Sequence, residues 1–383
     1  MYKIMISAGE ASGDLHGASV ANALKISRPD IALFGMGGQA MRAAGVEIVY
    51  DIAELGIIGL VEVVRNLPKL FKLRRMLADL MEKERPDVLV VIDYPDFNMR
   101  LARIAKQKGI PVVYYISPTV WAWRRGRAKE LARTTARVAA IFPFEADVYR
   151  EAGANVTFVG HPLLDIVKPT MAKEEAYRHF NADPSRPLVL LMPGSRQQEI
   201  VNLLPVMLTA GEKIVQQVPN CQFFLPVAST ISREMLQNII SGYNIDITLT
   251  TGHTYDLMGI ADIAVAASGT VVLEASLMGL PTIVIYKLAA LTYFLGKFLV
   301  KIPHFSLPNI IAGRQIIPEL IQNAANPDNV AQETAAILTD SATRNRILAD
   351  LAEVRDKLGE AGAVQRVAGV ILEVAEKSSG GQQ

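Results

Sequence analysis

The sequence has 383 residues, half of them hydrophobic, and its 39 basic residues balance 38 acidic ones. This length predicts two domains, because a single hydrophobic core rarely exceeds about 250–300 residues. The formal net charge of +1 excludes the strongly basic character that is typical of a nucleic-acid-binding domain. The single cysteine, Cys221, excludes an internal disulfide and a cysteine-based metal cluster, and it favours a reducing, cytoplasmic setting. The histidines are too scattered to indicate a metal site.

No segment of the sequence predicts a membrane-spanning helix. The longest apolar stretch, near Pro281–Val300, is interrupted by Lys287 and Lys297, which leaves nine uncharged residues between them. A spanning helix needs about 20 such residues. The apolar run at the N-terminus ends at Glu10 and is too short for a signal peptide. We therefore expect a protein that is soluble or lies on a membrane without crossing it.

In the first half of the chain, short apolar runs alternate with longer amphipathic stretches, which predicts a doubly wound parallel sheet. The expected strands are Lys3–Ser7, Ile31–Gly35, Glu47–Tyr50, Val88–Ile92, Val112–Ile116, Val138–Ile141 and Val156–Phe158. The expected helices are Gly13–Ser27, Leu67–Lys83, Phe97–Gln107, Arg124–Thr134 and Glu145–Glu151.

The segment Gly160–Pro187 is rich in proline and charge, holds at most one helix, and predicts a connection between domains. A second alternating set follows, with strands expected at Leu188–Met192, Gln222–Leu225, Asp246–Leu249, Ile263–Ala266 and Thr282–Ile285. After about Arg314 we expect helices to near Val374, and then a loose tail, Ser378–Gln383. The predicted domains are residues 1–165 and 166–355, with a C-terminal helix and tail, 356–383, that could pack back on the first domain.

Doubly wound domains bind ligands at the carboxyl ends of their strands, and two such domains normally leave a cleft between them. The first strand runs into GEASGD, Gly9–Asp14, whose small residues allow a sharp turn and a close approach to a ligand. The helix expected near Gly13 would offer free N-terminal amides to an anion. The segment could also be an ordinary turn, because it matches neither G-x-G-x-x-G nor the Walker A pattern.

The fourth strand ends in IDYPDFN, Ile92–Asn98. Asp93 directly follows the apolar run, and a carboxylate at that place can act as a general base toward a sugar hydroxyl. Asp96 could instead cap the next helix, or both residues could be turn carboxylates. Their spacing is not the D-x-D pattern that suggests a metal-bound nucleotide sugar.

The segment SPTVWAWRRGR, Ser117–Arg127, follows the fifth strand and holds both tryptophans, Trp121 and Trp123. Six basic residues and one acidic residue fall within Arg124–Arg137, a local charge of +5. This composition is typical of an aromatic and basic wall for an anionic or amphipathic substrate. Taken alone, it fits a helix start with a solvated basic face better.

In the second half, MPGSRQQE follows a predicted strand. Gly194 and Ser195 would open a helix, and Arg196 could reach a phosphate through two hydrogen bonds. Arg196 could equally be a surface arginine that pairs with Glu199.

The segment AASGTVVLEASLMGLP, Ala266–Pro281, joins a strand to a helix and carries the strongest pattern. The amides and hydroxyls of Ser268, Gly269 and Thr270 at the helix N-terminus suit a diphosphate. Glu274 lies one turn beyond Thr270 on the same face and could accept hydrogen bonds from ribose hydroxyls. A surface glutamate in a simple capped helix is the weaker alternative, because the helix is otherwise apolar.

The last polar signal is SLPNIIAGRQIIPELIQ, Ser306–Gln322. Asn309 and Arg314 are polar residues in an apolar setting. They predict contacts with a base or phosphate, or else hydrogen bonds within a loop that crosses between domains.

Together, GEASGD, IDYPDFN, SPTVWAWR, LMPGSR, AASGTVVLE and SLPNIIAGR resemble the lipid-A-disaccharide synthase family in order and spacing, over about Ile4–Gln322. Each motif alone is weak, but the six together are specific. The resemblance implies an α/β protein with two doubly wound, Rossmann-like domains that face each other across a cleft, as in GT-B glycosyltransferases. The first domain would bind the acceptor and face the membrane, and the second would bind a UDP-sugar.

The implied activity is an inverting hexosyl transfer in lipid A (lipopolysaccharide) biosynthesis. The donor would be UDP-2,3-diacylglucosamine and the acceptor 2,3-diacylglucosamine 1-phosphate (lipid X). The products would be the β-1′,6-linked disaccharide 1-phosphate and UDP, and no metal or other cofactor is implied. The family pattern matches the catalytic base to Asp93, and it matches substrate-binding positions to Arg196, Ser268, Gly269, Thr270, Glu274, Asn309, Glu10, Ser12 and Gly13. Whether Asp93 is the base or only orients the acceptor stays open.

Acylated substrates imply contact with a bilayer, on the cytoplasmic face of the inner membrane. Val61–Arg75, with a net charge of +4 among apolar residues, and Leu288–Lys301, with an apolar stripe flanked by lysines, are the two candidates. Basic and apolar side chains together suit an anionic membrane surface. The alternative for each is a core helix with solvated lysines. The C-terminal helices could cross between domains or between the subunits of a homodimer.

Three rival interpretations stay open at this level. One is another enzyme of the same architecture, such as a UDP-N-acetylglucosamine 2-epimerase or a transferase with a soluble acceptor. A second is a non-catalytic nucleotide-sugar sensor or membrane scaffold, which would not need Asp93. The third, a serine hydrolase using Ser12, Asp14 and His16, is poor, because the G-x-S-x-G spacing is absent.

Overall fold

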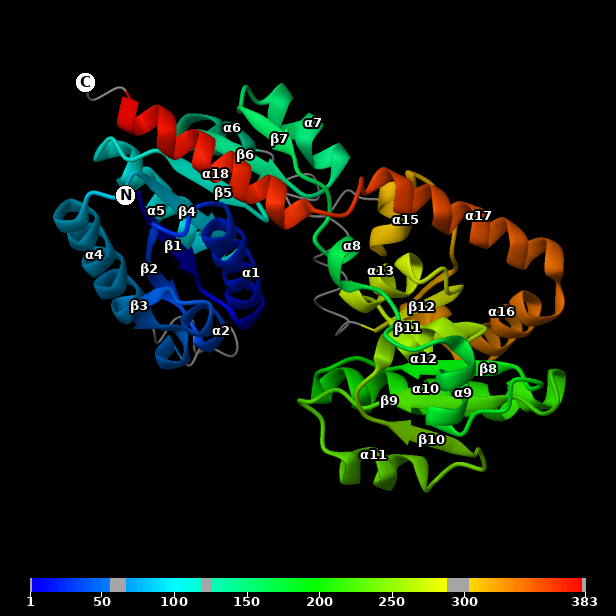
Figure 1. Ribbon diagram of the computed structural model, residues 1–383. Helices are drawn as coiled ribbons and strands as arrows, with labels where there is room; N and C mark the ends of the chain where they lie inside the picture. Colours follow the sequence, from blue (N-terminus) through cyan, green and yellow to red (C-terminus); the bar gives the residue numbers. More distant parts are fainter. Residues whose placement is uncertain (1, 56–66, 119–125, 288–302, 381–383) are drawn as a thin grey trace. The chain divides into compact units, whose positions relative to one another are not determined.

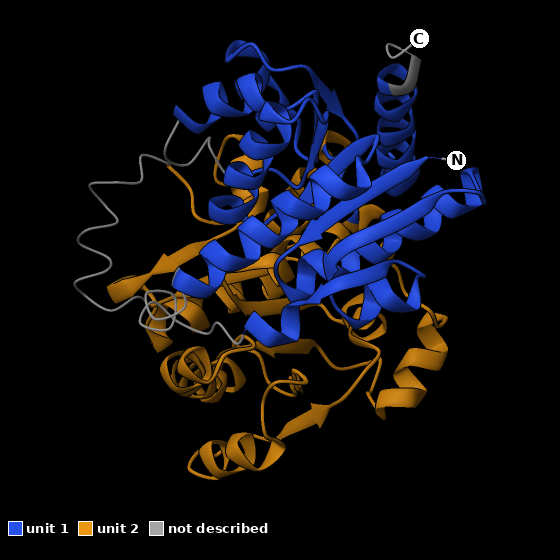
Figure 2. Cartoon of the chain, turned by 90° about the vertical axis from the view of Figure 1, so that its left-hand side faces the viewer, with its two compact units in different colours: residues 1–162, 358–383 blue, residues 163–357 orange. Residues whose placement is uncertain are grey.

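The computed structural model describes residues 2–55, 67–118, 126–287 and 303–380. The chain divides into two compact units, coloured separately in Figure 2. Unit 1 comprises Met1–Pro162 and Leu358–Gln383, and unit 2 comprises Leu163–Lys357. The candidate segments Trp121–Trp123 and Leu288–Lys301, and the first part of Val61–Arg75, lie outside the described residues.

The sheet of unit 1 has seven strands among the described residues, in the order β3-β2-β1-β4-β5-β6-β7. All neighbouring pairs are parallel. The strands are β1 (Lys3–Ala8), β2 (Ala32–Gly37), β3 (Glu47–Asp51), β4 (Val88–Ile92), β5 (Val112–Tyr115), β6 (Arg137–Ala140) and β7 (Val156–Phe158). The central strands are buried on both faces because helices cover both, which accounts for their continuous apolar sequences.

Two groups of helices cover the sheet of unit 1 (Figure 1). They are α1 (Ala11–Ser27), α2 (Gln39–Ala43), α4 (Leu67–Glu84), α5 (Pro95–Gln107), α6 (Gly126–Thr134), α7 (Pro143–Glu151) and α18 (Ala363–Gly380), with a 3₁₀ turn, η1, at Ile52–Leu55. Leu89 and Val91 of β4 share one core cluster with side chains of α4, α5 and α6. Helices α1 and α18 pack against each other and against β4.

Helix α18 belongs to unit 1 although it follows unit 2 in the sequence. Its Glu373 pairs with Arg137 of β6 at 3.0 Å, and Arg366 Nε donates to the carbonyl of Val159 at 2.7 Å. Val367 and Ile371 are fully buried. The chain therefore leaves unit 1 after Pro162 and returns to it at Leu358.

The sheet of unit 2 has six parallel strands among the described residues, in the order β10-β9-β8-β11-β12-β13. They are β8 (Leu188–Met192), β9 (Gln222–Pro226), β10 (Ile247–Thr250), β11 (Ile263–Ala267), β12 (Thr282–Tyr286) and β13 (Glu319–Ile321). The helices are α8 (Leu163–Ile166), α9 (Lys173–Phe180), α10 (Gln197–Gln217), α11 (Arg233–Ile240), α12 (Thr254–Ile260), α13 (Thr270–Leu277), α15 (Leu307–Ala312), α16 (Pro327–Thr339) and α17 (Ser341–Lys357), with a 3₁₀ turn, η2, at Gln322–Ala324.

The prediction of doubly wound parallel sheets is confirmed, and the predicted strands agree with the observed ones to within two residues at each end. Three details of the prediction are wrong. The segment Gly160–Pro187 holds two short helices rather than one at most, and helix α18 continues through Ser378–Gly380 of the expected loose tail. Strand β13 falls in a stretch expected to be helical, because its three residues pair in parallel with β12. None of the described helices is long and apolar enough to cross a membrane.

Each sheet reverses its strand order at one internal pair of strands: β1 with β4 in unit 1, and β8 with β11 in unit 2. In open α/β sheets, ligands bind outside the carboxyl ends of the strands at such a switch point. The loops after these four strands begin at Gly9, Asp93, Pro193 and Ser268. The topology therefore brings the strongest sequence motifs together in two pairs, one in each unit.

Candidate active site

The residue that follows β4, Asp93, lies in a backbone conformation that side chains rarely adopt. Asp93 and the next residue, Tyr94, have φ angles of 49° and 48°. Left-handed conformations of residues other than glycine cost about 1–3 kcal/mol each and cluster at functional sites. Pro95 then begins α5, with Tyr94 as its N-cap, so Asp96 lies inside the helix and does not cap it. Asp96 forms an ion pair with Arg127.

A buried asparagine holds this turn. The Asn98 side-chain amide is fully buried and donates to the carbonyls of Asp93 at 2.8 Å, Ile92 at 3.1 Å and Ser7 at 3.2 Å. Its own carbonyl accepts a hydrogen bond from Ser7 Oγ at 2.8 Å. The hydroxyl of Tyr114 also donates to the Asp93 carbonyl, at 3.1 Å. These bonds fix the backbone of Asp93 while its carboxylate stays partly exposed.

Two carboxylates meet at the switch point of unit 1. Burial raises the pKa of Asp93 above its ordinary value, although the Tyr94 backbone N–H opposes the shift. Partial burial also raises the pKa of Glu10, and the negative charge of Asp93 adds to that effect. A carboxylate that is more basic than usual is a better general base near neutral pH.

The segment after β1 forms a helix earlier than predicted. Helix α1 begins at Ala11 with Glu10 as its N-cap, so Ser12 and Gly13 lie in the first turn. Ser12 is exposed, whereas Gly13 is buried, and a Cβ at Gly13 would lie 3.3 Å from the Cβ of Ala8. Gly13 therefore serves the close packing of helix on strand, and only the Glu10 and Ser12 side chains are accessible.

Asp14 has a structural role that the sequence did not reveal. Its side chain is 6% exposed and accepts hydrogen bonds from the backbone N–H groups of Gly38 at 2.7 Å, Ala40 at 2.9 Å and Met41 at 3.1 Å. The carboxylate therefore anchors the turn between β2 and α2. With its oxygens committed to these amides, Asp14 cannot serve a hydrolase triad with Ser12 and His16.

A cavity of about 690 Å³ adjoins this end of the unit 1 sheet. It is lined by Gly9, Glu10, Ala11, Asp14, Gly38, Gln39, Asp51, Ile52, Ala53, Leu55 and Tyr94. A Cβ at Gly9 would lie 2.1 Å from the Tyr94 ring, so only glycine leaves room for that ring. The lining combines apolar side chains with the carboxylates of Glu10 and Asp51, which can accept hydrogen bonds from hydroxyl groups.

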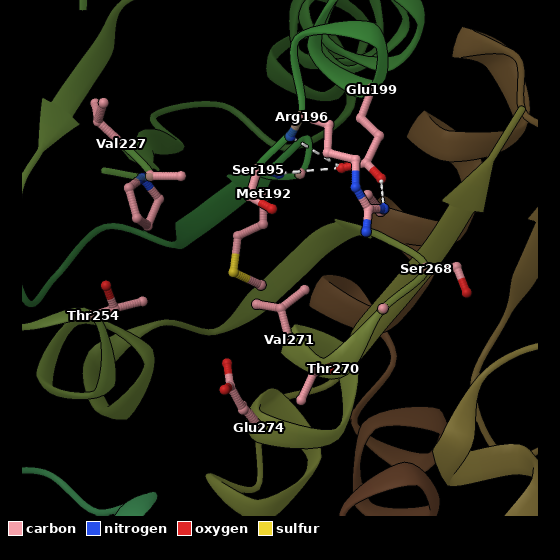
Figure 3. Close-up of a pocket in the computed structure, with 15 residues that line it drawn as sticks. Met192, Ser195, Arg196, Glu199, Val227, Thr254, Ser268, Thr270, Val271 and Glu274 are labelled. Atoms are coloured by element: carbon pink, nitrogen blue, oxygen red, sulfur yellow. Dashed lines mark hydrogen bonds and ion pairs between the residues drawn. The ribbon is translucent and has the colours of Figure 1, made fainter. Parts of the chain in front are cut away.

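The switch point of unit 2 carries a pocket of about 380 Å³ (Figure 3). It is lined by Met192, Gly194, Ser195, Arg196, Glu199, Pro226, Val227, Ala228, Thr254, Ala267, Ser268, Gly269, Thr270, Val271 and Glu274. The pocket unites the loops after β8 and β11 with the loop after β9. The volume and the mixture of polar and apolar groups are typical of a small-molecule site.

Helix α13 begins at Thr270, with Gly269 as its N-cap, and points its N-terminus at this pocket. No acidic residue occupies its first turn, so its amides and positive dipole end remain suited to an anion. Glu274 lies one turn further on, and Figure 3 shows both Thr270 and Glu274 at the pocket wall. The structure therefore places the predicted group of Ser268, Gly269, Thr270 and Glu274 in one site.

Glu274 is half-buried, and burial raises its pKa, although a hydrogen bond from Tyr255 opposes the shift. The Tyr255 hydroxyl donates to Glu274 Oε1 at 3.3 Å. Burial, with the negative charge of Glu274, in turn raises the pKa of Tyr255 to about 12. The hydrogen bond from Tyr255 holds Oε1 of Glu274, and we expect the other carboxylate oxygen to accept bonds from a ligand. Tyr255 carried no recognisable signal in the sequence.

Arg196 stands at the other wall of the pocket, as the N-cap of α10. Its side chain is 78% exposed and pairs with Glu199 at 2.9 Å. The predicted surface ion pair with Glu199 is therefore present, and Arg196 also lines the pocket, while its contact with a phosphate stays a prediction.

Asn309 does not reach the pocket. It is fully buried, donates to the Ile317 carbonyl at 3.0 Å and to Glu319 Oε1 at 2.8 Å, and accepts from the N–H groups of Ile316 and Ile317. Its side chain therefore holds the loop between α15 and β13. Arg314 likewise pairs with Asp350 at 2.6 Å and Glu353 at 2.7 Å of α17. Both side chains therefore make bonds inside unit 2, and the loop that holds them does not cross between the units as the sequence alternative had it.

The sequence of the whole chain matches one family of enzymes. A model of the lipid-A-disaccharide synthetase family matches residues 4–370. The lipid-A-disaccharide synthase of Geobacter sulfurreducens is 45% identical over 377 residues, which cover 98% of each chain.

Two solved structures share the fold. The UDP-GlcNAc 2-epimerase from Neisseria meningitidis bound to UDP-GlcNAc is 14% identical, with a TM-score of 0.67 over 97% of this chain and 100% of that one. The glycotransferase of kitacinnamycin is 16% identical, with a TM-score of 0.65 over 97% and 98% of the two chains. At these identities, the likeness concerns the fold alone.

The whole-chain family match decides between the rival interpretations that the sequence left open. The epimerase shares the fold but is only 14% identical to this chain, whereas the synthase of Geobacter sulfurreducens is 45% identical. A non-catalytic sensor is also set aside, because the family is one of enzymes. The chain belongs to the lipid-A-disaccharide synthase family of glycosyltransferases, which make the lipid A disaccharide.

Proposed function

We propose that this enzyme transfers the glucosamine unit of UDP-2,3-diacylglucosamine to the 6-hydroxyl of 2,3-diacylglucosamine 1-phosphate. The products are the β-1′,6-linked disaccharide 1-phosphate and UDP. The observation that carries the proposal is the unit 2 pocket, where two strand-end loops and Glu274 form one site at a topological switch point.

The donor nucleotide binds in that pocket. The N-terminus of α13, with Ser268, Gly269 and Thr270, faces the diphosphate, and Arg196 adds a positive charge from the opposite wall. Glu274 accepts hydrogen bonds from the ribose hydroxyls, with Tyr255 holding one of its oxygens. Asn309 acts through the loop that it holds rather than by touching the donor, since its amide is fully used.

Unit 1 binds the acceptor. Asp93 accepts the proton of the acceptor 6-hydroxyl as that oxygen attacks the anomeric carbon of the donor. UDP leaves from the opposite face of the sugar, so the single displacement inverts the centre. Fixed positive groups at the α13 N-terminus and Arg196 stabilise the charge that grows on the diphosphate, which is a major source of catalysis in such reactions. Glu10 and Ser12 line the acceptor side of this reaction, and Gly13 allows the packing that places them.

This chemistry needs no metal or other cofactor. The leaving group is stabilised by amides and a guanidinium, and the attacking oxygen is activated by a carboxylate. No group of three or more His, Cys, Asp and Glu side chains suited to a metal ion occurs among the described residues.

We further infer that the enzyme works at the cytoplasmic face of the inner membrane, as a peripheral protein. In support, α4 exposes Lys69, Lys72 and Arg75 together with Phe71, which is 51% exposed. Leu73, an apolar residue of the same segment Val61–Arg75, instead lies in the core at 3% exposure. Basic side chains beside an exposed aromatic ring suit an anionic lipid surface.

Purified protein with both lipid substrates in detergent, in the presence of EDTA, tests the reaction. We expect a disaccharide 1-phosphate and UDP in equal amounts. Release of UDP without disaccharide would mean another acceptor or hydrolysis. For the membrane, Lys72→Glu with Arg75→Glu should weaken binding to anionic vesicles and leave activity on detergent-dispersed substrates intact, and unchanged vesicle binding would refute that role of α4.

A further inference from the structure

Arg196, which we assign to the donor diphosphate, and the backbone amides at the start of α10 already hold an anion. Glu199 Oε2 accepts hydrogen bonds from the backbone N–H groups of Ser195 at 3.1 Å and Arg196 at 3.3 Å. Its other oxygen, Oε1, accepts from Arg196 Nη1 at 2.9 Å. Figure 3 shows these contacts at the wall of the pocket. One carboxylate therefore occupies two amides and the guanidinium together.

This arrangement depends on the local backbone. Gly194 has a φ angle of 111°, and a Cβ there would lie 2.2 Å from Glu199 Oε2. Only glycine therefore allows the carboxylate to fold back over the loop. The Glu199 side chain is 14% exposed and the Arg196 side chain is 78% exposed. The carboxylate is therefore enclosed, while the guanidinium lies in solvent.

A carboxylate and a diphosphate need the same donors. Both accept charge-assisted hydrogen bonds from backbone N–H groups at a helix N-terminus and from an arginine. Two anions cannot share these donors closely without repulsion, which costs several kcal/mol across a close contact. Binding of a nucleoside diphosphate at this loop thus requires Glu199 to give up some of its bonds.

We infer that Glu199 is a resident anion that competes with the donor diphosphate for Ser195 and Arg196, and so weakens the binding of UDP and its sugars. This inference rests on the proposed donor site. Glu199 keeps the empty loop ordered and neutralises Arg196. When the diphosphate arrives, the carboxylate rotates away, and when UDP leaves it returns, so the residue favours product release.

Binding of UDP to Glu199→Gln tests this role by calorimetry. Glutamine has the size and the acceptor oxygen of glutamate but lacks its charge. We expect UDP to bind roughly 3- to 30-fold more tightly to the variant than to wild type. Uridine, which lacks phosphates, should bind both proteins equally. The gain should shrink with added salt, because it is electrostatic. Inhibition by UDP as product should strengthen in parallel.

Glu212→Gln is the matched control. It removes the same charge from the same helix, outside the pocket, and should leave UDP affinity unchanged. Glu199→Ala provides a second variant should glutamine disturb the loop, and the two should shift UDP affinity in the same direction. Weaker or unchanged UDP binding in both Glu199 variants would overturn the inference, because Glu199 would then only organise the loop.

Failure of the donor site itself gives a different result. If wild type binds no UDP, or if Arg196→Ala leaves UDP affinity unchanged, the diphosphate does not bind at this loop. If Arg196→Ala weakens UDP binding and the Glu199 variants do not strengthen it, the donor site stands and the competition is refuted.

Discussion

Asn98 offers a sharp test of how the fold positions the proposed base. Its amide makes four hydrogen bonds at a fully buried position, to Asp93, Ile92 and twice to Ser7. Substitution by alanine removes all four and leaves Ser7 Oγ buried without its acceptor. With about 0.5–1.5 kcal/mol for each bond, and more for an unsatisfied buried group, we expect Asn98→Ala to cost about 3–5 kcal/mol of stability.

The expected effect on activity is separate from the effect on stability. Without Asn98, one of the two side chains that hold the Asp93 carbonyl is lost, and the left-handed turn can relax toward a common conformation. A displacement of about 1 Å at a reacting group can cost about 10²-fold in rate. We expect the kcat of Asn98→Ala to fall about 10- to 100-fold at a temperature where the variant is folded. UDP affinity should not change, because the donor pocket belongs to unit 2.

Ser7→Ala is the matched control, because it removes one bond of the same network without touching Asp93. It should cost about 1–2 kcal/mol and leave kcat within about threefold of wild type. The assay is disaccharide formation at saturating substrates, with urea unfolding of each variant. A folded Asn98→Ala protein with the kcat of wild type would refute the idea that this network positions the base.

Three carboxylates, those of Glu274, Asp93 and Glu145, give three further predictions. Glu274→Gln should weaken the binding of both UDP and uridine by about 1–3 kcal/mol, measured by calorimetry, because its carboxylate is assigned to ribose; an effect on UDP alone would contradict that assignment. Burial raises the pKa of Asp93, and a base must be ionised, so kcat should fall as pH decreases through a pKa above the ordinary value of about 3.9; a flat wild-type profile down to pH 4 would argue against the base. Glu145 on α7 is 2% exposed, and burial raises its pKa to about 8, so between about pH 5 and that value the folded state retains a proton that the unfolded state loses. The unfolding free energy of wild type should therefore decrease as pH rises across that range, and Glu145→Gln should lose much of this dependence.

Much of the fold could be predicted from the sequence because the central strands are buried on both faces. Short, continuous apolar runs such as Val88–Ile92 are typical of the inner strands of a parallel sheet, and the ends of these runs placed Asp93 and Ser268 beside the switch points. Strand β13 could not be predicted, because three residues are too few to show the alternation of apolar and polar residues that marks a strand. Its pairing with β12, rather than its own sequence, makes it a strand.

The hydrogen-bond partners of the site could not be predicted, because they join residues far apart in the chain. Ser7 and Asn98 lie 91 positions apart. For Asn309, the sequence suggested a ligand contact that the structure does not show. An isolated polar residue in an apolar segment is equally compatible with a ligand contact and with the buried, fully bonded amide that is observed. The sequence predicted the ion pair of Glu199 with Arg196. It could not predict the contact of Glu199 with the loop amides, because that contact depends on the conformation of Gly194.

The most direct test of the central claim is the single-turnover rate of Asp93→Asn, measured with saturating donor and acceptor. Asparagine tolerates the left-handed conformation of this position, so the variant removes the base without forcing the turn to change. We predict a loss of about 10²–10⁴-fold in the rate of disaccharide formation, with UDP affinity as in wild type. Turnover close to that of wild type would show that Asp93 is not the base and would contradict the account.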